Sequence, residues 1–390
     1  MLAEQLKIWL SAPYMHGSEI KYIQEAFNSN WIAPAGSNID GFELDLENYY
    51  NDNGNNSDSA AQYNAAALSS GTAAIHLGLV LLGVQNGDEV LVQTHTHIAS
   101  ANPVLYLGAT PVFIDSEKDT WNICPLILEE AILDRIAKGK KPKAIVAVHL
   151  YGMPYKHDEI NALSKKYGIP VLEESAEALG SSYKGQKCGT LGTIGTLSFN
   201  GNKIITTSGG GAIVTNKKEW KEKAIFLSTQ AKDKAAHYQH SEIGYNYRLS
   251  NICAGIGRGQ MEVLNSHVAL RRAINAFYTD LFSNIEGVSV FKEYNAACFS
   301  NHWLTAVLID ADSIGSKTSE NLRLALLKNE IESRPLWKPM HLQPVFKDCL
   351  FYGGNVAKEL FGKGLCLPSG SNLTEIDKQR IHDSLHRFFN

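Results

Sequence analysis

Residues 89–114 read EVLVQTHTHIASANPVLYLGATPVFI. Two short apolar segments, 89–93 and 111–114, are typical of buried strands, and we expect the segment between them, 98–107, to be a helix. The same alternation extends in both directions, with helices expected at 72–82, 125–137 and 158–167 and strands at 144–149 and 171–173. Strands that alternate with helices predict an α/β fold: a mostly parallel sheet with helices on both faces.

The length of the chain, 390 residues, exceeds what one ordinary hydrophobic core holds and predicts two domains. A long helical stretch, 249–282, is followed by strand candidates at 288–291 and 303–309. We therefore expect a large domain over residues 1–265, which begins with a helix at 18–28, and a smaller α+β domain over 266–390. The polar segment 51–59 is expected to be a surface loop.

The composition favours a soluble globular protein, with 44% hydrophobic residues, 19% charged residues and a formal net charge of -4. This charge balance offers no basic field for nucleic acid. No apolar run reaches the roughly 18 residues of a membrane helix, and residues 1–7 lack a signal-peptide pattern. The six cysteines form no CxxC pair, so neither a zinc site nor a disulfide framework is indicated, and we expect a cytoplasmic location.

Ligands of open α/β sheets bind beyond the carboxyl ends of the strands. Ser70, Gly71 and Thr72 open the helix at 72–82, where free N–H groups favour a phosphate, although an ordinary N-cap has the same composition. His97 follows the strand 89–93 and offers a flat imidazole. His95 and His97 could also be metal ligands, but no Cys, His or Glu at convincing spacing accompanies them, so we predict no metal site.

Acidic residues follow the strand 171–173. Glu173, Glu174 and Glu177 need a cationic partner if they are buried, and a protonated pyridine nitrogen is one such partner; at least one of Glu173 and Glu174 could instead be a solvated loop acid. Lys203 lies in SFNGNKIITTSGGG, residues 198–211, which we interpret as a hairpin with the lysine on a short apolar strand. A desolvated lysine there could bind a carbonyl cofactor, and the alternative is a surface lysine.

Together these features match the needs of pyridoxal 5′-phosphate. The chain also resembles, nearly end to end, the DegT/DnrJ/StrS sugar aminotransferases of the fold-type I, aspartate-aminotransferase-like enzymes. The resemblance rests on WIAPAG, LSSGTAAIHLGL, YLGATPVFID, HLYGMP, ESAEALGSSYKG, SFNGNKIITTSGGG, GYNYRLSN and RPLWKPMH. With STQAKD, HYQH and CLPSGS, these segments look most like the bacillosamine-pathway branch, which aminates C4 of a UDP-linked 4-keto-6-deoxy-N-acetylhexosamine.

The resemblance implies a role for each candidate residue in the cofactor site. Lys203 would bind pyridoxal 5′-phosphate covalently and shuttle the proton. His97 would stack on the pyridine ring, and Asn246 would reach the phosphate in the neighbouring subunit, which implies an obligate homodimer with shared active sites. The residues that would hold the phosphate are Ser70, Gly71, Thr72 and Ser198.

Two acids depart from the family pattern. Glu174 stands where relatives carry the Asp that pairs with the pyridine nitrogen, so its carboxylate is one methylene longer; we expect Glu174 to do this job and Glu173 to point elsewhere. Glu177 stands where relatives carry Gln or His near the phenolic oxygen of the cofactor. The sequence leaves open whether Glu177 is protonated.

The implied reaction transfers an amino group from L-glutamate to C4 of the UDP-linked keto sugar. Lys203 favours transamination, because family members that dehydrate sugars at C3 carry His in its place. Arg334, Trp337 and His341 are candidates for binding the sugar nucleotide, although Trp337 could simply pack the domain interface. His237, in a polar loop with Tyr238 and His240, is a weaker candidate.

Three alternatives stay open. The chain could aminate C3 of a 3-keto sugar nucleotide, or C4 of a GDP-linked sugar. It could also be a non-catalytic regulatory protein with the same fold. The first two alternatives predict the same cofactor absorbance with another substrate preference, and the third predicts no covalent cofactor.

Overall fold

The computed structural model describes residues 7–52, 61–315 and 317–389. Most of the predicted surface loop at 51–59 lies outside these residues, as do residues 1–6 of the N-terminal segment. Residue 51 itself ends a helix, α2 (Ser37–Asn51).

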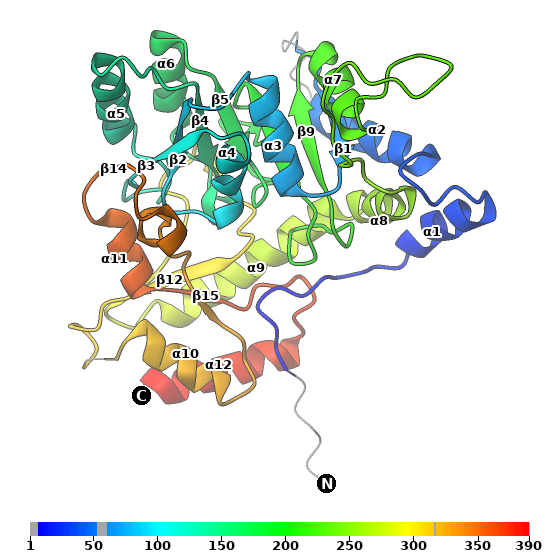
Figure 1. The fold of residues 1–390 in the computed structure, drawn as a ribbon. Helices are drawn as coiled ribbons and strands as arrows, with labels where there is room; N and C mark the ends of the chain where they lie inside the picture. Colours follow the sequence, from blue (N-terminus) through cyan, green and yellow to red (C-terminus); the bar gives the residue numbers. More distant parts are fainter. Residues whose placement is uncertain (1–6, 53–60, 316, 390) are drawn as a thin grey trace.

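Eight strands form one mixed sheet in the upper half of Figure 1, in the order β1-β9-β8-β5-β4-β2-β3-β14. Strand β9 runs antiparallel to β1 and β8, and the other pairs in this sheet are parallel. The predicted α/β fold with a mostly parallel sheet is therefore confirmed. The strands are β1 (Asn64–Leu68), β2 (Glu89–Gln93), β3 (Thr110–Ile114), β4 (Ala144–Val148), β5 (Val171–Glu174), β8 (Ile194–Ser198), β9 (Gly211–Thr215) and β14 (Phe351–Tyr352).

Helices cover both faces of this sheet because its strands are apolar on both faces. Val90 and Val92 of β2 pack on one side with α3 (Gly71–Leu81) and α4 (Asn102–Tyr106). Leu91 points to the other side, into a core made with α5 (Pro125–Ala137) and α6 (His157–Tyr167). Figure 1 shows α5 and α6 on one side of the sheet and α3 and α4 on the other.

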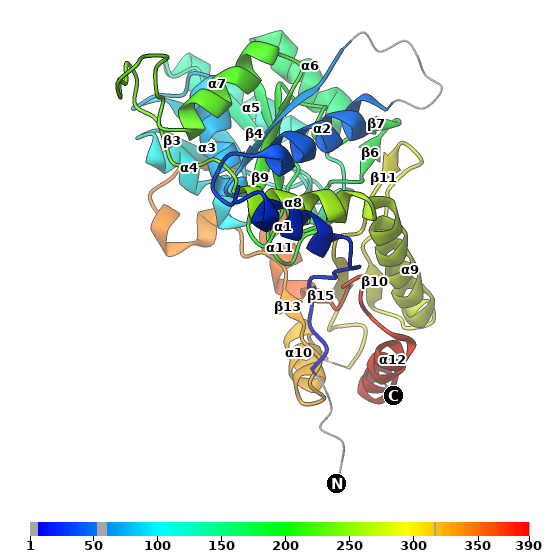
Figure 2. The same ribbon diagram turned by 90° about the vertical axis from the view of Figure 1, so that its right-hand side faces the viewer.

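The β1 end of the sheet is covered by further helices. Helix α7 (Lys218–Ser228) packs against β1 and α3, and α8 (Asn251–Met261) packs against α1 (Glu19–Asn28) and α2. Figure 2 shows α1, α2 and α8 side by side on this face. The predicted N-terminal helix at 18–28 is confirmed as α1, with Ser18 as its N-cap.

A second sheet, in the order β10-β12-β15-β13, lies below the first in Figure 1. It packs with α9 (Leu264–Phe282), α10 (Ser319–Leu327) and α12 (Glu375–Phe389), and Ile8 joins the same core. Residue 265 falls in the first turn of α9, and the domain boundary placed there stays a prediction. The strands are β10 (Val288–Val290), β12 (Thr305–Ile309), β13 (Arg334–Pro335) and β15 (Gly364–Leu367).

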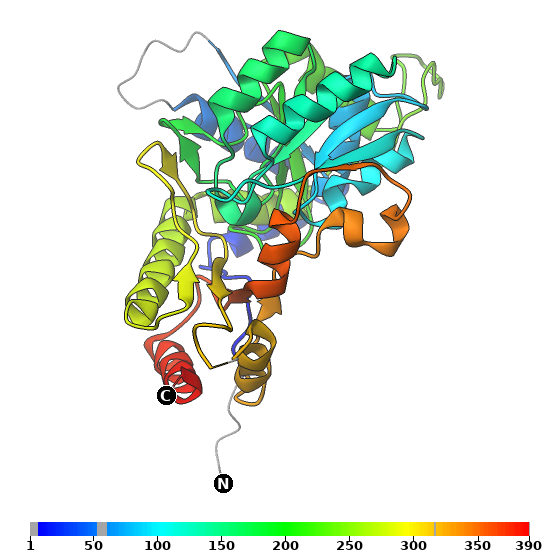
Figure 3. The same ribbon diagram turned by 90° about the vertical axis from the view of Figure 1, so that its left-hand side faces the viewer.

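Short elements connect the two sheets, and Figure 3 shows α11 (Val356–Lys363) between them. Strands β11 (Cys298–Phe299), β6 (Ser182–Tyr183) and β7 (Gln186–Lys187) form a small third sheet. The 3-10 helices are η1 (Ile98–Ser100), η2 (Leu150–Gly152), η3 (Met340–Leu342) and η4 (Pro344–Phe346). Among the described residues, no helix is both long and apolar enough to cross a membrane.

Three predicted elements need correction. The helix expected at 98–107 is divided into η1 and α4, because Pro103 lacks an N–H group and is accommodated only near the start of a helix. The helical stretch 249–282 is two helices, α8 and α9, separated at residues 262–263. Lys203 is not on a strand: β8 ends at Ser198, and the lysine lies in the β8–β9 loop, residues 199–210.

Candidate active site

A cavity of about 290 Å³ opens beyond the carboxyl ends of β5 and β8. It brings together nine of the residues that the sequence singles out, from segments far apart in the chain. The nine are Ser70, Gly71, Thr72, His97, Glu174, Glu177, Ser198, Lys203 and Trp337. Their common position supports one binding site, while the role of each residue stays a prediction.

The N-terminus of α3 forms one wall of the cavity. Ser70 is its N-cap, with its side-chain oxygen accepting a hydrogen bond from the Ala73 N–H (3.0 Å). The backbone of Gly71 lies so close to β8 that an added Cβ would be 2.8 Å from Cβ of Ser198. The first N–H groups of the helix and the Ser198 hydroxyl therefore face the same space, which suits a phosphate.

Lys203 enters the cavity from the β8–β9 loop. The loop turns back at once, since the Lys203 N–H donates to Asn200 O (3.0 Å) and the Thr207 N–H donates to Phe199 O (2.9 Å). Ile204 and Ile205, which we interpreted as part of a strand, are buried in the core beside β8 and β9 and anchor the loop there. The lysine side chain is 13% exposed, and its Nζ lies 4.3 Å from the centre of the Trp303 ring.

Glu173 and Glu174 point in opposite directions because side chains alternate along a strand. Glu174 lines the cavity, where its Oε2 accepts a hydrogen bond from Ser100 Oγ (2.8 Å) and its Oε1 accepts one from the Ala176 N–H (3.0 Å). Glu173 is fully buried away from the cavity. The expectation that Glu173 points elsewhere is therefore confirmed, and the alternative of a solvated acid applies to neither residue, since Glu174 is only 5% exposed.

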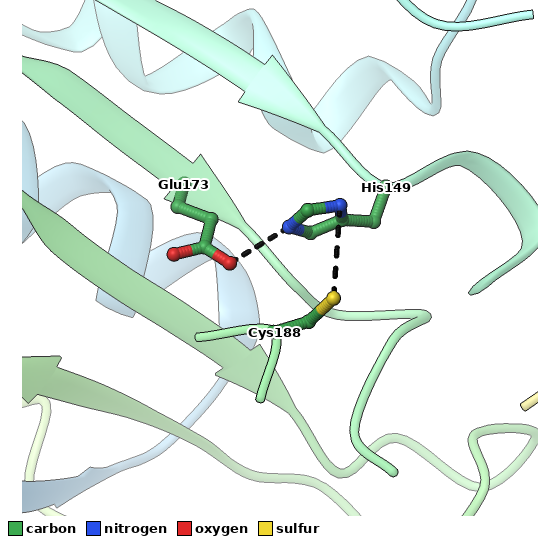
Figure 4. Close-up of side chains that lie close together, drawn as sticks. All are labelled: His149, Glu173 and Cys188. Carbon is green, nitrogen blue, oxygen red and sulfur yellow. Dashed lines mark hydrogen bonds and ion pairs between the residues drawn. The ribbon is translucent and has the colours of Figure 1, made fainter. Parts of the chain in front are cut away.

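Glu173, His149 and Cys188 lie together behind the sheet end, as Figure 4 shows. His149 Nε2 donates to Glu173 Oε1 (2.7 Å), and its Nδ1 accepts from the Tyr155 N–H (3.2 Å). Glu173 Oε2 accepts from the N–H groups of Leu191 and Gly192, both at 2.7 Å. Burial opposes the charge of Glu173, but these hydrogen bonds outweigh it and hold the pKa of Glu173 below its usual value.

The Nδ1 atom of His149 and both carboxylate oxygens of Glu173, which a metal ion would need, thus already accept hydrogen bonds from N–H donors. Three groups would also fall short of the four ligands of a structural zinc site. We interpret the cluster as structural, because it fastens the loop 189–192 to β4 and β5.

Glu177 is the acid nearest to Lys203, with 3.5 Å between its Oε1 and the lysine Nζ. Its Oε2 accepts a hydrogen bond from the Tyr151 N–H (2.7 Å). Burial raises the pKa of Glu177 to about 7, with Lys203 lowering it and Glu174 raising it as smaller contributions. Glu177 can therefore exchange a proton near neutral pH, which answers in part the question that the sequence left open.

His97 and Trp337 line the same cavity and are in T-shaped contact, with 5.1 Å between ring centroids. Desolvation by the cavity walls, and then the charge of Lys203, lower the pKa of His97, so we expect a neutral imidazole. A neutral ring in this cavity is suited to contact a planar ligand.

A larger cavity of about 710 Å³ adjoins the first, and the two share Asn202 and Trp337. Its walls are mostly apolar, and Arg334 and Lys338 supply positive charge. Arg334 is exposed and pairs with Glu332 (2.7 Å between Nη2 and Oε1). Two of the predicted substrate residues, Arg334 and Trp337, thus line a space beside the Lys203 cavity.

Three predicted residues lie outside both cavities. Asn246 is exposed, in an isolated bridge with Thr229. His237 is exposed in the loop after α7, where its Nε2 lies 3.2 Å from Gln239 Oε1. His341 is held elsewhere, with its Nδ1 at 2.7 Å from Thr94 Oγ1 and its ring stacked on Phe351, so direct contact with a ligand in either cavity is not supported.

Several cavity residues were not predicted from the sequence. Trp303 begins the segment that leads into β12, and Asn202 precedes the lysine. The Nε1–H group of Trp303 donates a hydrogen bond to the backbone oxygen of Asn202 (2.7 Å). No spacing in the sequence links residues about 100 positions apart, and only the bulk of Trp303 beside a predicted strand could have drawn attention to it.

The donor set fits pyridoxal 5′-phosphate at three points. The amino group of Lys203, once deprotonated, is available for the carbonyl carbon, and the Glu174 carboxylate is available for a protonated ring nitrogen. Glycine is required at position 71 because the backbone there lies close to β8. The space beside the helix N-terminus is thereby left for the phosphate. We observe no group in the cavity that conflicts with this ligand.

The comparisons with known proteins agree with this geometry. The model of the DegT/DnrJ/EryC1/StrS aminotransferase family matches residues 13–386. The chain is 49% identical to EpsN of Bacillus subtilis (strain 168), a provisionally assigned pyridoxal phosphate-dependent aminotransferase, with 98% of this chain and 96% of EpsN covered. It is 36% identical to the GDP-perosamine synthase of Escherichia coli O157:H7, with 97% of each chain covered. An aminotransferase structure from Brucella abortus superposes with a TM-score of 0.86 at 26% identity, covering 96% of this chain and 95% of that one.

Proposed function

The chain belongs to the DegT/DnrJ/EryC1/StrS aminotransferase family, whose members use pyridoxal phosphate, and from this premise we propose that it aminates a keto sugar linked to a nucleotide. The amino group would come from L-glutamate, which leaves as 2-oxoglutarate. The observation that carries the proposal is the common position of Lys203, Glu174 and the N-terminus of α3 in one cavity beside a larger one.

The bound cofactor would supply an electron sink next to the carbon that gains or loses the amino group. Lys203 would bind it and then, when released, move a proton at Nζ between the substrate carbon and the cofactor. Glu174 would hold the proton of the ring nitrogen. Ser70, Gly71, Thr72 and Ser198 would bind the phosphate, and His97 would lie against the ring.

Glu177 would set the charge around Lys203. Because its carboxyl is buried and lies 3.5 Å from Nζ, it can pair with the ammonium group or hold a proton of its own when the amine is engaged. The Tyr151 N–H fixes the other carboxyl oxygen, so proton exchange takes place at Oε1. This arrangement would keep one proton near the reacting atoms.

The sugar nucleotide would enter through the larger cavity, with Arg334 near the diphosphate and Trp337 between the two cavities. We propose a UDP-linked 4-keto-6-deoxy-N-acetylhexosamine as the first candidate substrate, on the sequence segments given above. A GDP-linked 4-keto sugar is a second candidate, because a GDP-perosamine synthase matches 97% of the chain at 36% identity. Neither relative reported above supports a role in bacillosamine biosynthesis, so the proposal does not extend to that pathway.

The experiment is an assay of 2-oxoglutarate formation from L-glutamate with UDP-, dTDP- and GDP-linked 4-keto-6-deoxy sugars. We expect turnover with the UDP-linked sugar and none with Lys203→Ala. Lys217 is an exposed lysine outside both cavities, so Lys217→Ala is the matched control and should keep full activity. Preference for the GDP-linked sugar would favour the second candidate, and no turnover with any keto sugar would refute the proposal.

We also propose a homodimer with shared active sites. Asn246 is exposed and separated from its own cavity, and the nearby α1 region exposes the apolar side chains of Phe27, Trp31 and Ile32 (58%, 57% and 46%). Mixing inactive Lys203→Ala with inactive Asn246→Ala subunits tests this. Shared sites would restore about a quarter of wild-type activity, since half of the dimers would be hybrids with one intact site. A monomer, or no restored activity, would contradict it.

A further inference from the structure

Two buried hydroxyl groups stand behind Glu174, outside the cavity lining. Ser100 Oγ lies 2.8 Å from Glu174 Oε2 and 2.7 Å from Thr96 Oγ1. Thr96 and Ser100 are 1% and 0% exposed. They belong to the segment after β2, whereas Glu174 ends β5, and β4 lies between these strands. The hydroxyl pair therefore connects two separate parts of the sheet edge at the acid.

The direction of these hydrogen bonds follows from the number of protons. A carboxylate can only accept, so Ser100 donates its single hydroxyl proton to Glu174. Thr96 must then donate to Ser100 Oγ, and the relay points from Thr96 to Glu174. Because the Ala176 N–H donates to Oε1 (3.0 Å), each carboxylate oxygen is fixed by one donor of the protein.

A glutamate needs this fixation more than an aspartate does, because its side chain has one more rotatable bond. Three charged or titratable side chains share the cavity with Glu174: Lys203 from the β8–β9 loop, Glu177 from the turn after β5, and His97 from the segment after β2. A mobile Glu174 could turn toward the Lys203 ammonium group. In the structure Lys203 pairs with Glu177, and Glu174 is held by Ser100 and Ala176.

We infer that Thr96 and Ser100 are positioning residues that hold the Glu174 carboxylate at a fixed place for the ring nitrogen of the cofactor. The inference rests on the proposed role of Glu174. It explains how the site accepts a carboxylate one methylene longer than Asp: the longer side chain is held by hydrogen bonding to Ser100, which Thr96 supports, on the segment after β2. Neither Thr96 nor Ser100 lines the cavity, so both would act through Glu174.

The test is a titration of the cofactor-free, full-length protein with pyridoxal 5′-phosphate, which gives the dissociation constant and the absorption maximum of the bound cofactor. Ser100→Ala should weaken binding about tenfold or more, the worth of a hydrogen bond to a charged group, and should shift the absorption maximum. Thr96→Val should have a smaller effect in the same direction, and Thr96→Ser, which keeps the hydroxyl, should restore the wild-type values.

A double-mutant cycle separates positioning from packing. In the Glu174→Asp background the shorter carboxylate is withdrawn from the hydroxyl, so Ser100→Ala should change the dissociation constant by less than about twofold. Ser228→Ala is the matched control, because Ser228 is also fully buried but bonds to Ile225 O, away from the cavity. It should leave both readouts unchanged.

Three outcomes would overturn the inference while the proposed function stands. Ser100→Ala could bind the cofactor like the wild type, its effect could be equal in the two backgrounds, or Thr96→Ser could behave like Thr96→Val. If the wild-type protein itself binds no pyridoxal 5′-phosphate, the proposed function fails instead. The two failures are therefore distinguishable in one titration.

Discussion

Replacing Glu177 with glutamine should remove a pH dependence from the stability of the cofactor-free protein. Burial raises the pKa of Glu177 from 4.5 to about 7, so the folded state holds this proton more tightly than the unfolded state does. At low pH the carboxyl is neutral and the penalty for burying its charge is absent. As pH rises from about 4.5 to about 7 the group becomes charged and stability falls, by about 3 kcal/mol at 1.4 kcal/mol per pKa unit.

Urea unfolding of wild type and Glu177→Gln between about pH 5 and about pH 8 measures this contribution. The unfolding free energy of the variant, relative to wild type, should increase through this range and level off above the folded-state pKa. Glu320→Gln is the control: Glu320 is exposed, and its hydrogen bond with Arg323 lowers its pKa. Since that group stays charged throughout the range, its difference from wild type should be flat.

A second variant checks the cause. Lys203 lowers the pKa of Glu177, so Lys203→Ala should raise that pKa and move the pH dependence to higher pH. If the difference between wild type and Glu177→Gln does not change with pH, the buried acid is not titrating near neutral pH, and the reasoning from its environment is refuted.

Three further predictions concern Gly71 at the N-terminus of α3 and the two neighbouring acids, Glu173 and Glu174. Gly71→Ala would place a Cβ 2.8 Å from Cβ of Ser198. We therefore expect the free energy of unfolding in urea to fall by about 1–3 kcal/mol and cofactor binding in a titration to weaken. Unchanged cofactor binding would show that Gly71 does not help to bind the phosphate. Glu173→Gln puts an amide NH2 where a carboxylate oxygen accepts from buried N–H donors, and we expect a loss of about 1–3 kcal/mol in urea unfolding, with a wild-type cofactor spectrum. Glu174→Gln should alter both the cofactor spectrum and the transamination rate, and if neither changes, Glu174 does not pair with the ring nitrogen.

Much of the fold follows from local patterns. The strands at 89–93 and 111–114 are apolar, short and bounded by polar or glycine residues, and the structure places β2 and β3 within one residue of those limits. The same reasoning places the acids at the end of β5, and the twofold repeat of a strand explains why Glu173 and Glu174 face opposite ways. Such features are predictable because each depends on neighbours in the sequence.

The site is less predictable where tertiary contacts decide it. Ile204 and Ile205 look like strand residues, but they anchor a loop whose turns present Lys203. Trp303 contacts that lysine from 100 positions away, and Ser100 reaches Glu174 from 74 positions away. No local pattern encodes these contacts, because they arise only when β2, β5, β8 and the segment before β12 meet at one sheet edge.

The most direct test of the central claim is chemical trapping at Lys203. The protein loaded with pyridoxal 5′-phosphate is reduced with borohydride, digested, and examined by peptide mass spectrometry. We predict that the yellow absorbance is lost and that the pyridoxyl group is found on the peptide containing Lys203. Binding of the cofactor with no modified lysine, or with the group on another lysine, would contradict the assignment of Lys203 as the catalytic amine.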